Sequence, residues 1–218
     1  MIRLDPRTTA MVCIDLHRGH LDPRVATLPL PPEQCRRVIA STRELLEKLR
    51  GAGVPVIHVL TEYRESAEIA ANPFWAAVHD DPTKARRGIL RHNLAGSPGT
   101  EPIPELLGPG DRLVRTKKRY SAFYATDLDF LLRSLGARAV ILAGVNTNSC
   151  IQCAAFEACN RDYLVVVAAE CVDTMDGDDL HRFALENIRR ALGWVLTNEG
   201  ILAAVGASAL PSWRVSAP

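Results

Sequence analysis

The run Ala139-Val-Ile-Leu-Ala-Gly-Val145 (AVILAGV), followed directly by Asn146-Thr-Asn-Ser-Cys150, decides the fold of this chain. Seven consecutive apolar residues have about the length of one β-strand, and such continuous apolar character indicates a strand buried on both faces. Strands of this kind belong to parallel sheets that carry helices on both sides. The polar turn after the strand places Cys150 at the start of the next helix.

The rest of the chain repeats this alternation of strand and helix patterns. Short apolar or β-rich runs predict strands at residues 10–14, 54–60, 112–116, 139–145, 163–169 and 194–196. Apolar residues at three- and four-residue spacing predict helices at residues 32–50, 127–135, 149–160 and 178–192. We therefore expect an α/β protein, a three-layer α/β/α fold with a mainly parallel, Rossmann-like six-stranded sheet.

One helix gives a specific packing expectation. In the amphipathic pattern of residues 178–192, the side chains expected to face inward are Phe183, Leu185, Ile188 and Leu192.

The length of 218 residues suits a single domain, with its core at about residues 7–205. Residues 61–110 carry Pro73, Pro82, Pro98, Pro102, Pro104 and Pro109 and show little periodicity, which is typical of a functional lid or an insertion. Residues 206–218 are expected to form a loosely attached tail.

Composition excludes several classes of protein. The formal net charge of +1 gives no electrostatic support for binding nucleic acid, and no apolar run is long enough to span a membrane. Six cysteines in 218 residues are too few for a disulfide scaffold. Without an export signal near Met1, we expect a cytoplasmic protein with free thiols.

Polar side chains follow the predicted strands, where ligands bind in open parallel sheets. These residues are Asp15, Thr61, Glu62, Lys117, Lys118, the Asn146–Cys150 turn and Glu170. Cys150 begins a helix, and helix N–H groups and a nearby lysine lower the pKa of a thiol. Asp15 could accept the thiol proton, and the same N–H groups could hold an oxyanion. The pattern therefore predicts a cysteine nucleophile, with Asp15 and a lysine as partners.

Other interpretations of these residues stay open. An aspartate at a strand end can be a turn residue, and Lys118 and Arg119 can belong to a solvated basic turn. Cys150 and Cys153 form a C-x-x-C pair, which would suit a thiol redox protein.

No catalytic or metal-binding role is expected for the histidines and the remaining cysteines. Asp15, His17 and His20 could bind a metal, but two histidines in a short loop are more often solvated, so no metal site and no cofactor is expected. The cysteines assigned to packing are Cys13, Cys35, Cys159 and Cys171.

Four motifs resemble those of the isochorismatase-like cysteine hydrolases, in family order over about residues 7–205. They are Met11-Val-Cys-Ile-Asp15, Gly96-Ser-Pro-Gly-Thr-Glu101, Lys117-Lys-Arg-Tyr-Ser-Ala-Phe123 and Gly144-Val-Asn-Thr-Asn-Ser-Cys150. The superfamily includes nicotinamidases, N-carbamoylsarcosine amidase, ureidoacrylate amidohydrolase, and biuret and triuret hydrolases.

The resemblance implies a catalytic set and a reaction. Cys150 would be the nucleophile, Asp15 the acid and base, and Lys117 the residue that holds both in place. A cis peptide between Val145 and Asn146 would turn the Asn146 N–H beside that of Cys150, and the two would form the oxyanion hole. The implied reaction is hydrolysis of a non-peptide C–N bond through a thioester, with release of ammonia or an amine.

Departures from the family motifs narrow the choice among the branches of the superfamily. The acid and histidines that nicotinamidases carry around the second strand are missing, and Cys150 argues against vinyl-ether cleavage. We expect a small amide, carbamoyl or ureido substrate, while a small-molecule-binding relative without catalytic activity stays an alternative. Because family members commonly assemble as dimers or tetramers, the resemblance implies a homo-oligomer, a dimer or tetramer. The residues expected to line the substrate pocket are Glu62, Arg86, Arg87, Tyr120 and Tyr124.

Overall fold

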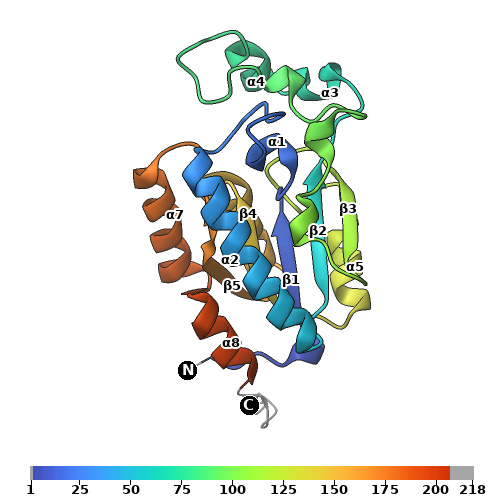
Figure 1. Ribbon diagram of the computed structural model, residues 1–218, viewed down its shortest axis with the longest axis vertical. Helices are drawn as coiled ribbons and strands as arrows, with labels where there is room; N and C mark the ends of the chain where they lie inside the picture. The colour runs from blue at the N-terminus through green and yellow to red at the C-terminus, as the bar shows by residue number, and fades with distance from the viewer. Residues whose placement is uncertain (1, 207–218) are drawn as a thin grey trace.

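A six-stranded sheet lies between two layers of helices in the computed structural model, which describes residues 2–206 (Figure 1). All neighbouring strands are parallel, in the order β3-β2-β1-β4-β5-β6. The strands are β1 (Thr9–Ile14), β2 (Val56–Thr61), β3 (Arg112–Lys117), β4 (Ala139–Val145), β5 (Leu164–Asp173) and β6 (Trp194–Leu196). The three-layer α/β/α fold expected from the sequence is confirmed.

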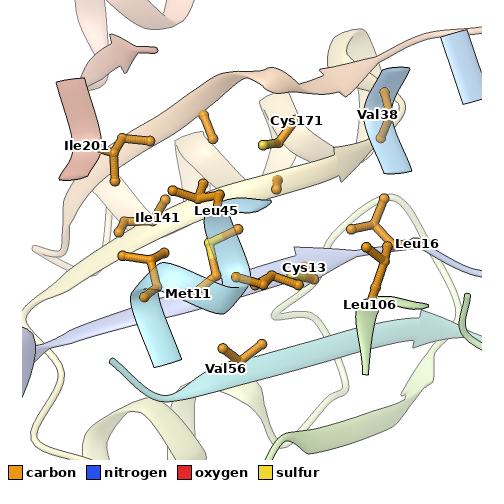
Figure 2. Packing of buried hydrophobic residues seen from close by; sticks show 14 of the residues in the cluster. Met11, Cys13, Leu16, Val38, Leu45, Val56, Leu106, Ile141, Cys171 and Ile201 are labelled. Atoms are coloured by element: carbon orange, nitrogen blue, oxygen red, sulfur yellow. The ribbon is translucent and has the colours of Figure 1, made fainter. Parts of the chain in front are cut away.

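Alternate side chains of the inner strands enter two separate cores. On one face, Met11 and Cys13 of β1 pack with Val38 and Leu45 of α2 (Pro32–Gly51) and with residues of α8 (Asn198–Gly206) (Figure 2). On the other face, Val12 and its alternating neighbours pack against helices of the opposite layer. These helices are α5 (Leu128–Ser134), α6 (Gln152–Cys159) and α7 (Asp178–Ala191). Because both faces are covered, the strands read as continuous apolar runs.

Two expectations about the later elements are wrong. β5 runs on to Asp173, so Glu170 is an exposed residue within the strand and lies before its carboxyl end. Phe183 is 65% exposed, because α7 turns Ala184 and Ile188 into the core instead. The helix expected over residues 178–192 is therefore present, but the inward orientation expected for Phe183 is wrong.

Residues 61–110 cross the carboxyl ends of the strands, above α1 (Arg18–Leu21) (Figure 1). The segment contains α3 (Ser66–Ala70), α4 (Pro73–Val78) and the 3-10 turns η2 (Ile89–Arg91), η3 (Pro98–Thr100) and η4 (Pro104–Leu106). It has a small apolar cluster of its own, in which Ile69, Trp75 and Ile89 pack with Tyr63 and Leu28. The segment is therefore anchored by packing despite its irregular sequence.

Two remaining features concern the ends of the chain and the membrane. A further 3-10 turn, η1 (Pro6–Thr8), leads into β1. The tail expected at residues 206–218 lies outside the described residues, apart from Gly206 at the end of α8. Within residues 2–206, none of the helices combines the length and the apolar character needed to cross a bilayer.

Candidate active site

Sheet register brings Asp15, Thr61 and Lys117 to the same edge. Thr61 at the end of β2 pairs directly with Lys117 at the end of β3. Asp15 follows β1, and its N–H donates to the carbonyl oxygen of Val59 at 2.8 Å. Asp15 has a φ of 56°, a left-handed conformation that aspartate tolerates better than most residues. The carboxyl ends of three adjacent strands thus place three polar side chains in contact.

The side chain of Lys117 is the centre of a buried polar cluster. Its Nζ donates to Asp15 Oδ2 at 2.6 Å, to Thr61 Oγ1 at 2.8 Å and to Cys150 Sγ at 3.4 Å. The other carboxylate oxygen, Asp15 Oδ1, accepts from the Thr61 N–H at 2.9 Å and from the Thr61 hydroxyl at 2.8 Å. Lys117 is 2% exposed, Asp15 is 1% exposed and Cys150 is 5% exposed. The three residues that the motifs singled out therefore meet in one water-excluded cluster.

Burial and charge act against each other in this cluster. Burial raises the pKa of Asp15, but Lys117 and His17 lower it more, so the pKa lies well below its usual value. Burial lowers the pKa of Lys117, but Asp15 raises it more, so the lysine stays charged. Burial raises the pKa of Cys150 to about 11, although Lys117 opposes this. The resting cluster is therefore a carboxylate–ammonium pair beside a neutral thiol.

Gly144 allows β4 to approach β1 beside the cluster. It pairs in register with Ile14, and it has a φ of 129°. A Cβ atom at this position would lie 1.9 Å from the Ile14 carbonyl oxygen. Only glycine fits this close approach of two backbones, which brings the turn after β4 next to Asp15.

The turn after β4 carries Cys150 in a single π-helical turn, η5 (Thr147–Ile151), that leads into α6. The helix expected over residues 149–160 therefore begins with irregular geometry. The Val145–Asn146 peptide bond is cis, as the resemblance implied. The Asn146 side chain is fixed within the fold, because its Oδ1 accepts from the Met175 N–H at 3.0 Å.

A small pocket opens beside Cys150 and encloses about 40 Å³. One water centre needs about 10–15 Å³, so the space admits only a small chemical group. The lining residues are Asp15, His20, Leu28, Thr61, Tyr63, Trp75, Arg86, Ile89, His92, Lys117, Arg119, Tyr120, Asn146 and Cys150.

Two of the five expected substrate-binding residues line this pocket. Arg86 donates to Asp176 through both terminal nitrogens, at 2.9 and 3.0 Å, and its Nε donates to the Tyr120 hydroxyl at 3.3 Å. Burial lowers the pKa of Arg86, but Asp176 and Tyr120 raise it more, so this guanidinium is held as a cation. Arg86 and Tyr120 therefore form a rigid polar wall.

The other three expected pocket residues lie outside the lining. Glu62 pairs with Arg115 at 3.4 Å, Arg87 borders a separate surface hollow, and Tyr124 is 66% exposed. Arg119, which was expected in a solvated turn, does line the pocket, with its guanidinium carbon 5.2 Å from the centre of the Trp75 ring. No periodic or motif signal marks Trp75.

Three histidines lie in and beside the pocket, which overturns the expectation of solvated side chains. His17, His20 and His92 are 0%, 5% and 4% exposed. Burial lowers the pKa of His20 to about 3 and places that of His92 well below its usual value, so both are neutral. His92 was missed because it lies more than 70 positions from His20 in the sequence, in a segment without periodicity.

Comparisons with known proteins agree with the fold. The isochorismatase domain model matches residues 9–200. The ureidoacrylate amidohydrolase RutB of Methylobacterium radiotolerans is 30% identical over 203 residues, which cover 89% of this chain and 78% of the relative.

Solved structures also match the chain over most of its length. An isochorismatase family protein from Burkholderia thailandensis is 32% identical with a TM-score of 0.74, covering 95% of this chain and 100% of that one. N-carbamoylsarcosine amidase from Thermoplasma acidophilum is 26% identical with a TM-score of 0.69, covering 88% and 97%.

Fold and cluster together define a three-layer α/β/α protein with a buried cysteine beside a lysine–aspartate pair at the carboxyl edge of its sheet. With the family model matched over residues 9–200, the chain belongs to the isochorismatase domain family and is an isochorismatase-like hydrolase.

Proposed function

We propose that this protein is a cysteine-dependent amidohydrolase that cleaves a non-peptide C–N bond in a small linear amide, carbamoyl or ureido compound. The observation that carries the proposal is the contact of Lys117 Nζ with both Asp15 Oδ2, at 2.6 Å, and Cys150 Sγ, at 3.4 Å, on the wall of a pocket. The names of the relatives, a ureidoacrylate amidohydrolase and an N-carbamoylsarcosine amidase, support the same class of reaction.

In the proposed first step, Asp15 accepts the proton of the Cys150 thiol as the sulfur attacks the carbonyl carbon. The high pKa of the thiol and the low pKa of the carboxyl make this transfer uphill in the free protein, so we expect it to accompany carbon–sulfur bond formation. Lys117 keeps the carboxylate and the sulfur in reach of each other. The N–H groups of Asn146 and Cys150 are the proposed donors to the oxyanion.

In the second step, the tetrahedral adduct collapses and the C–N bond breaks. Asp15 returns its proton to the leaving nitrogen, and ammonia or an amine departs from a thioester on Cys150. Water then adds to the thioester while Asp15 accepts its proton, and cleavage of the C–S bond returns that proton to the thiol. The product is a carboxylic acid, or a carbamic acid where the substrate is a ureide.

The pocket supports a small substrate. A volume of about 40 Å³ accommodates a planar carboxamide or ureido group, while a larger group would require the wall to move. Residues 61–110 supply Tyr63, Trp75, Arg86 and His92 to that wall, so we propose that this segment of a single-domain protein acts as the lid.

The test is an ammonia-release screen of the full chain against carbamoyl, ureido and carboxamide compounds. Cys150→Ala should lower kcat by about 10⁴–10⁶-fold, as expected for loss of a nucleophile. Cys153→Ala is the matched control, since it removes a half-buried thiol one helical turn away and should retain most activity.

Three outcomes would contradict the proposal. Unchanged turnover in Cys150→Ala would show that Cys150 is not the nucleophile. Absence of ammonia release from every compound would favour a small-molecule-binding relative. A reversible Cys150–Cys153 disulfide under mild oxidant, in a protein that releases no ammonia, would favour the thiol redox alternative.

A cytoplasmic homo-oligomer, dimer or tetramer, belongs to the same proposal. Phe130 of α5 is 78% exposed and Phe183 of α7 is 65% exposed, and a subunit interface would cover such side chains. Sedimentation analysis tests the assembly, and a monomer at micromolar concentration would contradict it.

A further inference from the structure

Three of the six histidines of this chain gather in one buried cluster that the hydrolytic mechanism does not use. His17 directly precedes α1, His20 lies within it, and His92 follows η2, so the cluster joins two segments that are distant in the sequence. One ring nitrogen from each residue lies within 4.8 Å of the other two. Buried histidines in such numbers need partners for their ring nitrogens.

The spacing of the rings is that of histidines on one metal ion. Two imidazoles bound tetrahedrally at about 2.0–2.1 Å from a zinc ion have their ring centres about 5 Å apart. The observed centre-to-centre distances are 4.9 Å for His17–His20, 5.6 Å for His17–His92 and 4.7 Å for His20–His92. The ring centres therefore have about the required separation, while the ring nitrogens, which lie within 4.8 Å of one another, would need to lie about 3.3 Å apart around the ion.

Neighbouring oxygen atoms orient two of the rings. His20 Nδ1 lies 2.6 Å from the Leu28 carbonyl oxygen, which can only accept, so Nδ1 carries the proton and Nε2 keeps a free lone pair. His92 Nδ1 lies 2.7 Å from the Thr27 hydroxyl. Metal-binding histidines are typically fixed in this way, by an oxygen at the nitrogen that does not bind the metal.

The third ring has a nitrogen with no partner. His17 is fully buried, and its Nδ1 has no hydrogen-bond partner among the described residues. Its Nε2 lies 2.8 Å from Asn93 Nδ2 and 3.6 Å from Asp15 Oδ1, and in the tautomer whose Nε2–H faces the Asp15 carboxylate the Nδ1 lone pair is free for a metal. A buried nitrogen without a partner is unfavourable, and a bound metal ion would remove that cost.

We propose that His17, His20 and His92 form a binding site for one divalent transition-metal ion, with zinc as the best chemical match. Three neutral imidazoles and one open position are a common zinc coordination set. Because His20 and His92 line the substrate pocket, the fourth ligand would be water or a group of the substrate. The ion would also tie the pocket wall around His92 to the turn after β1.

Local backbone geometry supports the same arrangement. Gly19 lies between His17 and His20, and a Cβ there would meet Asn93 Oδ1 at 2.0 Å. Asn93, next to His92, adopts a left-handed φ of 50° and donates to the Thr61 carbonyl oxygen at 3.0 Å. Gly19 and Asn93 therefore allow the two histidine-bearing segments to come together.

The test measures metal binding by the full chain, without reference to activity. Protein freed of metal by a chelator is titrated with Co²⁺, read by its visible d–d absorption, and then with Zn²⁺ as a competitor. We expect one equivalent of Co²⁺, displaced by Zn²⁺, and a rise in Tm with Zn²⁺. His20→Gln and His92→Gln should each bind at least about 100-fold more weakly.

Two further variants separate this site from the rest of the chain. His181→Gln changes a histidine outside the cluster and should bind like the wild type. Cys150→Ala removes the nearby thiol as a possible cobalt ligand. Its cobalt spectrum should match that of the wild type, and neither spectrum should contain a thiolate charge-transfer band.

The proposal is overturned if the wild type binds no Co²⁺ or Zn²⁺, or if both glutamine variants fold and bind undiminished. A thiolate charge-transfer band that disappears in Cys150→Ala would also overturn it, by assigning the metal to the cysteine. Circular dichroism of each variant establishes that it folds. Since the readout is binding alone, failure here leaves the amidohydrolase proposal untouched.

Discussion

Replacement of Lys117 by methionine removes the cation at the centre of the buried cluster while keeping most of the side-chain volume. Asp15 would keep its two hydrogen bonds from Thr61 but lose the ammonium 2.6 Å from its Oδ2. Breaking a buried ion pair from one side typically costs about 3–5 kcal/mol, because an uncompensated charge is left behind. In a chain of 218 residues this corresponds to a fall in Tm of about 6–20 °C.

The loss should depend on pH in a defined direction. In the wild type, Lys117 holds the pKa of Asp15 well below its usual value, so the stability from this pair is fully present above the unfolded pKa and is lost as the pH falls from there through the lowered pKa. In Lys117→Met, burial remains and the largest charge opposing it is gone, so we expect the pKa of Asp15 to rise above its unfolded value although His17 still lowers it. The penalty for the buried carboxylate is then present at high pH and disappears as the pH falls through the raised pKa.

Urea unfolding followed by circular dichroism at pH 8 and pH 5 measures both effects. We expect Lys117→Met to show a larger deficit in the free energy of unfolding at pH 8 than at pH 5. Lys118→Met is the matched control, because the neighbouring lysine is only half-buried and should change stability by at most about 1 kcal/mol. Equal deficits for the two variants, or a deficit that grows as the pH falls, would refute the argument.

Three shorter predictions concern the surroundings of the cluster. Burial raises the pKa of Cys150 to about 11, so its alkylation by iodoacetamide should accelerate about tenfold per pH unit between pH 7 and 10; a plateau below pH 8, measured by mass spectrometry, would contradict this. Gly144→Ala places a Cβ 1.9 Å from the Ile14 carbonyl oxygen and should cost about 3 kcal/mol or more in urea unfolding; a variant of wild-type stability would show that the strands do not approach so closely. Arg86→Gln removes two charged hydrogen bonds to Asp176 and should cost about 2–3 kcal/mol; an unchanged thermal melt would argue against this pairing.

Sequence reasoning succeeded where a local pattern has a direct physical meaning. Continuous apolar runs identified the buried strands, because covered parallel strands have no polar face. The ends of those strands pointed to Asp15, Lys117 and Cys150, because parallel strands share a carboxyl edge. The same reasoning failed for Glu170, since a bulge between β4 and β5 lets β5 continue beyond its apolar run.

Pocket walls were less predictable because they come from residues 61–110, which have no period. Arg86 and Arg87 are adjacent arginines and both were expected in the pocket, but the structure places only Arg86 there and leaves Arg87 at a separate surface hollow. Tyr124 was expected in the pocket and is exposed, while Trp75 was not singled out and is buried. Such choices depend on which way an irregular backbone turns, and composition carries no information on this.

The sequence by itself indicated the family, through the resemblance of four motifs, and it determined the layered fold and the polar residues at the strand ends, which follow from short-range pattern and strand direction. Tertiary structure alone decided that Thr61 bridges the lysine and the aspartate, that Cys150 has a raised pKa, and that His92 joins His17 and His20. The physical reason is that burial and contact between distant segments set protonation and proximity. Both arise only when the chain has closed around its pocket.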